Sequence, residues 1–182
     1  MIAVQLESAD VSFPAKVRER LGEGRFQRLH ALGNLDLLQV RTTGLFCSVR
    51  CPGYAILSTY DQAARWRDNG RCIISGFHSP IEEECLRILL RGTQPVIVCP
   101  ARALPKRIPA AYRQPLSDGR MLILSCFDGR ARRNSRKRAI QRNDLVAAMS
   151  DEVFFAHITP GGQLARLTES LLNWAVPFGM IH

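Results

Sequence analysis

Residues 71–99 read RCIISGFHSPIEEECLRILLRGTQPVIVC, and this stretch decides the fold class. Two apolar runs of strand length, at 71–75 and 95–99, flank a longer amphipathic segment of helical length. Apart from Arg71 and Ser75 at its ends, the first run is apolar like the second, and neither alternates with polar residues, which is the pattern of strands buried on both faces of a sheet. The stretch therefore predicts a strand–helix–strand unit of a parallel sheet.

Local signals mark both ends of the helix in this unit. Ser79 as N-cap, Pro80 at the first helical position and Glu82 three residues after the cap form a capping box. Gly92 follows the last helical residues, and Arg91 lies where the helix macrodipole favours a cation. A helix is therefore expected from Pro80 to about Arg91.

The same alternation continues on both sides of the unit. Further strands are expected at 45–49, 121–125, 152–157 and 177–181, and helices at 54–69, 109–118, 136–149 and 163–173. Strict alternation implies right-handed crossovers, and so we predict an α/β fold: a Rossmann-like, doubly wound, mainly parallel sheet with helices on both faces. Residues 1–44 contain a helical or turn-like segment at 26–38. They are expected to form an N-terminal extension that packs on a core domain at 45–182.

The composition is that of a globular chain with a basic excess. The 182 residues include 25 Lys and Arg against 16 Asp and Glu, a formal charge of +9. No apolar run is long enough for a membrane span, and residues 1–10 lack the pattern of a secretory signal. The six cysteines have no C-x-x-C spacing, so buried reduced thiols in a cytoplasmic protein are expected, with no metal and no cofactor.

The positive charge is concentrated in residues 129–143, called the basic arm below. The arm carries seven basic residues and no acid, and without those seven the chain has 18 basic and 16 acidic residues. A local cluster of arginines suits a polyanion, because each contacted phosphate releases condensed counterions. The alternative is a solvated loop and helix face. The seven residues are Arg130, Arg132, Arg133, Arg136, Lys137, Arg138 and Arg142.

Three strand ends on one edge of the predicted sheet are small, polar or rich in glycine. In an open parallel sheet, ligands bind beyond the carboxyl ends of the strands, and a Gly-Gly pair before a helix offers free N–H groups to a phosphate. The alternative for Gly161 and Gly162 is a tight turn. Together the loops predict a phosphate or nucleotide site formed by Ser48, Arg50, Ser75, Gly76, Arg142, Asn143, Gly161, Gly162 and Gln163.

Polar residues near this edge have structural as well as functional interpretations. Asn143 shares a helix face with Ile140 and Ala147, so its amide needs partners, either in a ligand site or as a satisfied core asparagine. His78 and His157 both follow strands, but the sequence indicates no nucleophile–base pair. No catalytic residue is assigned.

Five short motifs occur in an order that resembles a known family. They are residues 29–38, Cys47-Ser48-Val49-Arg50, Ser75-Gly76, Arg142-Asn143 and Gly161-Gly162-Gln163-Leu164. The set resembles the DprA/Smf DNA-processing proteins, within the wider superfamily of Rossmann-like nucleotide-binding domains that includes the LOG phosphoribohydrolases. The resemblance spans roughly residues 13–182. Asp144 stands where the family usually has a second arginine.

This resemblance implies a DNA-binding module without catalysis. It implies single-stranded DNA in a basic cleft, loading of a recombinase onto that DNA, and dimerisation, in DNA processing, recombination or natural transformation. The residues expected to contact DNA are Arg50, Arg130, Arg132, Arg133, Arg136, Lys137, Arg138 and Arg142.

The alternative is a small-nucleotide sensor or a LOG-like hydrolase of the same superfamily. The phosphates of a mononucleotide or dinucleotide would then occupy the predicted phosphate site, and the basic arm would be incidental. The LOG motif Pro-Gly-Gly-x-Gly-Thr-x-x-Glu fits at Pro160, but Leu164 and Ala165 replace its Gly-Thr and Glu169 is one position late. DNA binding is therefore the preferred hypothesis.

Overall fold

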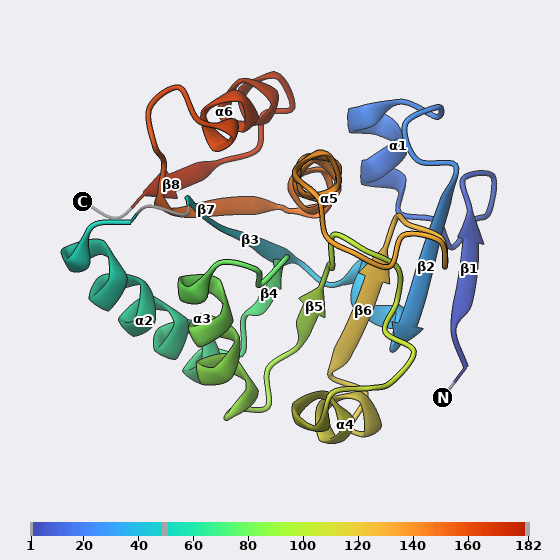
Figure 1. Ribbon diagram of the computed structural model, residues 1–182, viewed down its shortest axis with the longest axis horizontal. Helices are drawn as coiled ribbons and strands as arrows, with labels where there is room; N and C mark the ends of the chain where they lie inside the picture. The colour runs from blue at the N-terminus through green and yellow to red at the C-terminus, as the bar shows by residue number, and fades with distance from the viewer. Residues whose placement is uncertain (1, 49–50, 181–182) are drawn as a thin grey trace.

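The computed structural model describes residues 2–48 and 51–180, in which eight strands form one sheet with helices on both faces (Figure 1). The strands are β1 Val4–Glu7, β2 Arg28–Gly33, β3 Thr42–Cys47, β4 Cys72–Ser75, β5 Val96–Val98, β6 Met121–Ser125, β7 Glu152–His157 and β8 Phe178–Met180. The helices are α1 Ala15–Leu21, α2 Gly53–Asp68, α3 Pro80–Leu90, α4 Ala110–Ser117, α5 Arg136–Met149 and α6 Gln163–Asn173, with a 3-10 helix η1 at Leu35–Gln39.

The strand order is β1-β2-β6-β5-β4-β3-β7-β8, and its winding reverses beside β3. β3 pairs in parallel with both β4 and β7, while β5, β6 and β8 continue the parallel sheet outward on the two sides. At one edge, β2 pairs antiparallel with β6, and β1 pairs antiparallel with β2. The predicted doubly wound, mainly parallel α/β sheet is confirmed. Its switch point, where such sheets bind ligands, lies at the carboxyl ends of β3 and β7.

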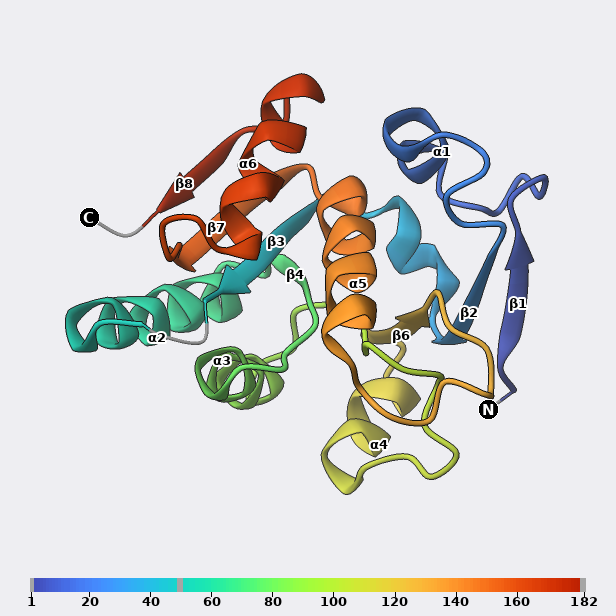
Figure 2. The same ribbon diagram turned by 45° about the horizontal axis from the view of Figure 1, so that its top comes forward.

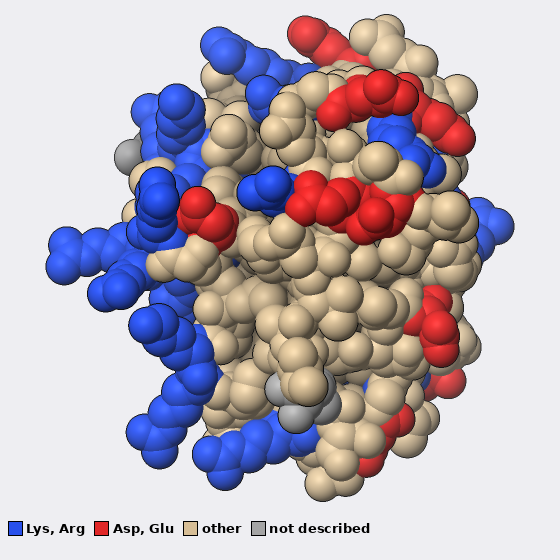
Figure 3. Space-filling model, turned by 90° about the vertical axis from the view of Figure 1, so that its right-hand side faces the viewer, with Lys and Arg blue, Asp and Glu red and all other residues tan. Residues whose placement is uncertain are grey.

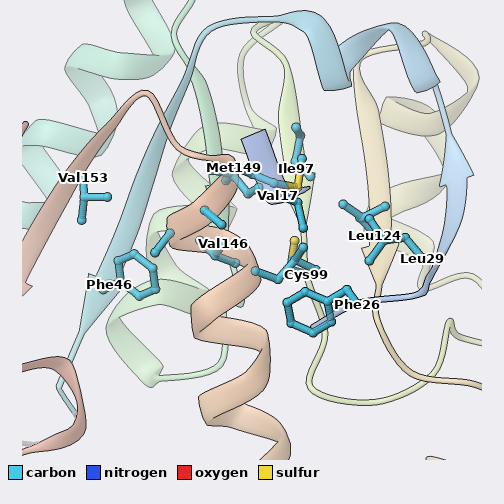
Figure 4. Packing of buried hydrophobic residues seen from close by; sticks show 14 of the residues in the cluster. Val17, Phe26, Leu29, Phe46, Ile97, Cys99, Leu124, Val146, Met149 and Val153 are labelled. Carbon is cyan, nitrogen blue, oxygen red and sulfur yellow. The ribbon is translucent and has the colours of Figure 1, made fainter. Parts of the chain in front are cut away.

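Helices α1, α5 and α6 cover one face of the sheet, and α2, α3 and α4 cover the other (Figure 1). The strands between these layers are apolar because they are buried on both faces, and every residue of β3, β4, β5 and β6 is buried. Figure 4 shows Val146 and Met149 of α5 among Phe46, Ile97 and Leu124 of the strands. Full burial of each such side chain contributes about 1.5–3 kcal/mol. None of the helices in the described residues is long and apolar enough to cross a membrane.

The local signals in residues 71–99 act as the sequence predicts. Ser79 Oγ accepts a hydrogen bond from the Glu82 N–H at 3.2 Å, and Glu82 Oε2 accepts one from the Ser79 N–H at 3.1 Å. The capping box is therefore formed, and α3 begins at Pro80. At the next helix of the site, Ser135 Oγ caps α5 by accepting a hydrogen bond from the Arg138 N–H at 3.3 Å.

The first 44 residues contain more regular secondary structure than the sequence indicates. The helical or turn-like prediction for 26–38 is wrong at its centre, where β2 forms, and only η1 agrees with it. β2 pairs with β6, from His30 opposite Ser125 to Gly33 opposite Leu122, so a distant partner rather than a local pattern makes this strand. The division of the chain at residue 44 stays a prediction. In the structure, β1 and β2 extend the same sheet.

The six cysteines are free thiols, as expected from their spacing. Cys47, Cys72, Cys85 and Cys99 are buried, and burial raises the pKa of each of these four thiols. They therefore behave as small apolar core residues.

Candidate nucleic-acid interface

A cavity of about 870 Å³ opens at the switch point of the sheet. Its walls come from the end of β3, from the loop between β7 and α6, and from the first turns of three helices. Figure 2 shows two of these helices, α5 and α6, side by side on one face of the sheet. The helix N-termini contribute Ser79 and Pro80 of α3, Ser135 and Arg136 of α5, and Gly162 and Gln163 of α6. The positive ends of three helix dipoles therefore meet at this cavity and favour an anion.

The loop before α6 is a tight turn built on a Pro-Gly pair. The Gly162 N–H donates to Thr159 O at 2.9 Å, with Pro160 and Gly161 between them. Gly161 has a φ of +69°, the left-handed conformation that the third position of a type II turn requires. The Thr159 N–H also donates to Ser48 Oγ at 3.0 Å, which ties the turn to the end of β3. Gly161 and Gly162 therefore form a tight turn that places the N-terminus of α6 at the cavity, and their predicted contact with phosphate stays a prediction.

The N-terminus of α6 differs from those of α3 and α5, because no side chain of the described residues caps it. Gly162 is its N-cap residue with a φ of −77°, which any residue can adopt. A Cβ at Gly162 would lie 2.9 Å from Thr159 O, so close packing rather than backbone angle requires glycine here. Gln163 begins the helix and lines the cavity. The first-turn N–H groups of α6 are therefore the ones available to a phosphate.

Glu82 fixes one wall of the cavity from inside. Its side chain is buried, Oε1 accepts a hydrogen bond from the Cys47 N–H at 2.9 Å, and Oε2 accepts one from the His78 N–H at 2.9 Å in addition to that from Ser79. Three backbone donors therefore satisfy the charge of this carboxylate. Glu82 joins the end of β3 to the start of α3 and holds the loops that line the site.

Arg142 is the buried cation of the cavity and is only 5% exposed. Its Nε donates to Asn143 Oδ1 at 2.8 Å, and its Nη1 donates to Cys99 O at 3.3 Å. Burial lowers the pKa of Arg142, and the negative charge of Glu82 opposes that shift. Within residues 2–48 and 51–180, no carboxylate forms a salt bridge with Arg142. A buried guanidinium in this state suits an anionic ligand, and Asn143 is the amide that orients it.

Gly76 makes room for this guanidinium. A Cβ on Gly76 would lie 1.0 Å from Arg142 Nη1, so no larger residue fits while Arg142 keeps its position. The neighbouring Ser75 is fully buried, and its Oγ accepts a hydrogen bond from the Phe77 N–H at 3.1 Å. Ser75 and Gly76 therefore build the turn that accommodates Arg142, and their predicted contact with phosphate stays a prediction.

The basic arm leaves the sheet after β6 and leads into α5. Its side chains Arg130, Arg132, Arg133, Arg136 and Lys137 are exposed, and Arg138 is half-buried. The buried Ala131 anchors the loop, and Arg138 Nη1 donates to Arg133 O at 2.6 Å. Among the described residues, none of these cations forms a salt bridge. Figure 3 shows Lys and Arg side chains projecting from one edge of the molecule, with most Asp and Glu away from that edge.

A second basic segment lies beside the arm, and sequence reasoning missed it. Residues 100–113 carry four basic residues and no acid, namely Arg102, Lys106, Arg107 and Arg113, all exposed. The Ala103 N–H donates to Ala131 O at 2.9 Å, which ties this loop to the arm. Only Lys106 and Arg107 are adjacent, and apolar residues and prolines separate the others, so the four cations form no obvious charge run. These residues connect a strand to a helix at the same edge of the sheet as the arm. Functional residues are often found in such loops, so this position could have indicated that the four cations belong to the site.

The structure brings six of the predicted site residues to one cavity. These are Ser48, Arg136, Arg142, Asn143, Gly162 and Gln163. Gly161 lies in the adjoining turn, and Gly76 lines a second cavity next to the first. Arg130, Arg132, Arg133, Lys137 and Arg138 lie on the arm outside the cavity lining. Arg50 lies outside the described residues.

The open sheet, its switch point and the electropositive cavity define a Rossmann-like α/β protein. A sequence model of the DNA recombination-mediator protein A family matches residues 5–162. The chain belongs to this family. Membership confirms the resemblance found in the motifs. A comparison with curated proteins finds no match.

Solved structures show the same fold at low sequence identity. The chain is similar to DNA processing protein A from Streptococcus pneumoniae, with a TM-score of 0.80, 18% identity and coverage of 98% of this chain and 62% of that one. It is also similar to DNA processing protein A from Helicobacter pylori, whose structure concerns its single-stranded DNA binding mode, with a TM-score of 0.74, 19% identity and coverage of 98% and 80%. A molybdenum cofactor binding protein from Rippkaea orientalis matches with a TM-score of 0.54, 14% identity and coverage of 77% and 75%. The chain thus spans about three fifths of the length of the Streptococcus pneumoniae protein.

Proposed function

We propose that this protein binds single-stranded DNA through the phosphate backbone and performs no chemistry on it. The observation that carries the proposal is the buried Arg142, without a salt bridge among the described residues, beside the uncapped N-terminus of α6. A phosphate there would receive backbone N–H groups, the helix dipole and a charge-assisted guanidinium bond together. One nucleotide of the strand would be anchored in this way.

The basic arm continues this site along the backbone. Arg136 lines the cavity, and the exposed Arg130, Arg132 and Arg133 precede it in the same loop. Each arm cation that neutralises a phosphate releases counterions, so these contacts add affinity without reading sequence. Arg50, which follows β3 in sequence, is proposed as a further contact.

A single strand fits this surface better than a duplex does. Arg142 is 5% exposed at the bottom of a concave site, so a phosphate must enter on a flexible backbone to reach it. Aromatic residues are sparse near the arm, with Phe127 the close one in sequence. Stacking is then a minor contribution along the arm, and sequence preference is weak.

The comparisons support the DNA ligand. The family is that of DNA recombination-mediator protein A, and the similar protein from Helicobacter pylori is described as binding single-stranded DNA. A recombinase, a second copy of the chain, natural transformation and a cytoplasmic location stay predictions for this protein.

The chemistry of the cavity favours binding over hydrolysis. Glu82, the carboxylate in the lining, uses both oxygens on backbone N–H groups. Glu169, which is one position late for the LOG motif, is exposed on α6 and is not part of the lining. A glycosidic hydrolase would need that carboxylate on the sugar.

Fluorescence anisotropy with a labelled oligothymidylate and a labelled duplex tests the proposal. We expect tighter binding of the single strand, and a log affinity that falls linearly with log salt. Equal affinity for the duplex, or binding that ignores salt, would overturn the proposal.

A second candidate is a small-nucleotide sensor, because the cavity of about 870 Å³ could enclose a mononucleotide with its phosphate at Arg142. A thermal shift assay separates the two, since a ligand that binds only the native state raises the melting temperature. Stabilisation by a mononucleotide and none by the oligonucleotide would favour the sensor. We expect the oligonucleotide to raise the melting temperature and the mononucleotide to leave it unchanged.

A further inference from the structure

A small cavity of about 170 Å³ lies between α5 and α6, and a carboxylate lines it. Asn143 and Gln163 line both this cavity and the one at the switch point, so the two adjoin. The carboxylate belongs to Asp144, the residue after Asn143 in α5. Among the described residues, Asp144 and Glu82 are the two carboxylates in the combined linings. A negative charge at this place repels the phosphate that the proposed function brings to Arg142.

The charges of these two carboxylates are compensated in different ways. Glu82 is buried and accepts hydrogen bonds from three backbone N–H groups of its own wall. Asp144 is half-buried, and its Oδ2 accepts a hydrogen bond from Nη2 of Arg25, which lies in the loop between α1 and β2. The charge of Asp144 is therefore compensated by a single exposed side chain that comes from outside α5 and α6.

The loop that carries Arg25 is anchored beside the site. The next residue, Phe26, is buried in the same core cluster as Cys99, whose carbonyl binds Arg142 (Figure 4). The guanidinium carbon of Arg25 lies 5.9 Å from the centre of the Phe26 ring, close enough for a cation–π contact. The Arg25 N–H also donates to Gly22 O at 3.3 Å. These contacts restrict the guanidinium to the neighbourhood of Asp144.

The thiol of Cys126 reports that the ion pair and Arg142 lie in one neighbourhood. Cys126 directly follows β6, and burial raises the pKa of its thiol to about 12. The positive charges of Arg142 and Arg25 lower the pKa of this thiol, and the negative charge of Asp144 raises it. All three charges therefore act on the same group at the carboxyl end of β6, and a change in the ion pair should be felt at the phosphate site.

We propose that Arg25 is a positioning residue of the phosphate site, which it keeps electropositive by pairing with Asp144 and not by contacting DNA. Without Arg25, the carboxylate of Asp144 faces a DNA phosphate at Arg142 with its full charge. The inference rests on the proposed function and adds to it a role for the loop between α1 and β2. This loop precedes β3 and lies far in sequence from every residue that lines the site.

A double-mutant cycle tests this role, with affinity for a labelled oligothymidylate measured by anisotropy at low and at high salt. Arg25→Gln leaves the charge of Asp144 unpaired, so we expect affinity to fall about threefold at low salt and less at high salt. Asp144→Asn removes the repelling charge, so its affinity should equal or exceed that of the wild type. The double variant Arg25→Gln/Asp144→Asn carries neither charge, and its affinity should return to within about 1.5-fold of the wild type.

Melting temperatures separate this electrostatic role from a structural one. Arg25→Gln and Asp144→Asn lose the same ion pair, so both should melt slightly lower, whereas only Arg25→Gln should bind DNA more weakly. Arg67→Gln is the matched control, because it breaks the ion pair of Arg67 with Asp68 at the end of α2. α2 ends just before β4 begins, so this pair lies at the opposite edge of the sheet from the cavity. The affinity of Arg67→Gln should match that of the wild type.

Three results would overturn the inference and leave the proposed function standing. Unchanged binding by Arg25→Gln would show that the charge of Asp144 does not reach the phosphate. An equal loss of affinity in Arg25→Gln and Asp144→Asn would show that the pair only holds the structure. A double variant that stays about threefold weaker than the wild type, with a salt slope shallower by about 0.7, would show that Arg25 binds a phosphate itself. If the wild-type protein binds no oligonucleotide, the proposed function fails as well.

Discussion

The cavity at the switch point and the basic arm both gather positive charge, but they do so in opposite ways. In the cavity, Arg142 is 5% exposed and is fixed by Asn143 and Cys99. On the arm, side chains such as Arg132 and Arg133 are exposed and stand away from carboxylates of the described residues. Buried charges are screened little by salt, whereas exposed charges are screened strongly. The cavity should therefore contribute to binding affinity through the geometry of its contacts, and the arm through the number of its charges.

The largest loss of DNA affinity should come from a substitution in the cavity. Arg142→Gln removes one charge-assisted bond to a desolvated phosphate, and we expect affinity for an oligothymidylate to fall roughly 10- to 100-fold. The slope of log affinity against log salt should become shallower by only about 0.7, because one phosphate contact is lost. Anisotropy titrations at several salt concentrations measure both quantities. Arg91→Gln, at an exposed residue after α3, is the control. Binding within twofold of the wild type in a folded Arg142→Gln protein would remove the cavity from the site.

Substitutions on the arm should change the salt dependence more than those in the cavity do, and the affinity less. Replacing Arg132, Arg133 and Arg136 with Ala should weaken binding about tenfold at low salt, for all sequences, and make the salt slope shallower by about 2. The difference from the wild type should shrink as salt rises. Replacing the exposed residues Arg41, Arg65 and Arg91 with Ala removes the same charge elsewhere and serves as the control. Unchanged binding and slope in the arm variant would show that the arm is a solvated surface only.

The turn before α6 allows geometry to be separated from stability. Gly162→Ala places a Cβ 2.9 Å from Thr159 O, so the backbone of the turn has to shift, and Gly162→Val adds further bulk at the mouth of the phosphate site; both variants should bind about fivefold or more weakly and also melt at a lower temperature. Gly161→Ala has open space for its Cβ but a φ of +69°. It should lose roughly 1 kcal/mol, or about 2–4 °C in melting temperature, and keep its affinity. Full binding by a normally folded Gly162→Val protein would show that this loop serves only as a turn.

The smallest effect on binding should come from the cap of α3. Ser79→Ala removes the hydroxyl that accepts the Glu82 N–H and should lower stability by about 1 kcal/mol, seen as a lower melting temperature. Affinity should stay within twofold, because the Glu82 carboxylate still holds Cys47 and His78. A loss of affinity as large as that of Gly162→Ala would instead identify Ser79 as a ligand contact.

Features that depend on neighbours in sequence could be predicted, and features that depend on distant partners could not. The Ser79 cap, the Ser135 cap and the apolar strands follow from local chemistry, and the structure confirms them. β2 depends on pairing with β6, and its short sequence carries no comparable signal. The sequence therefore predicted the parallel sheet and missed its antiparallel edge.

In the candidate site, too, some features could be predicted from local sequence and others depend on distant residues. The spacing of Gly161 and Gly162 before a helix indicated the N-terminus that lines the cavity. Ser75 and Gly76 were selected by the same reasoning, but the hydroxyl of Ser75 binds the Phe77 N–H and Gly76 accommodates a guanidinium from α5. Only the packed structure shows that the space left by Gly76 belongs to Arg142. Residues 100–113 escaped notice because their importance depends on lying beside the arm.

The pairing of β2 with β6 also sets an order of events during synthesis. Residues 28–33 leave the ribosome early, but the strand they pair with, at 121–125, is translated much later. Closing so long a loop is entropically costly and slow, so the antiparallel edge forms after the parallel strands have begun to assemble. Until β6 emerges, Leu29 and Ala31, which are buried in the finished protein, remain exposed on the nascent chain. Exposed apolar surface of this kind makes an incomplete chain prone to aggregation, and a β6 that pairs slowly with β2 would prolong the exposure beyond its own synthesis.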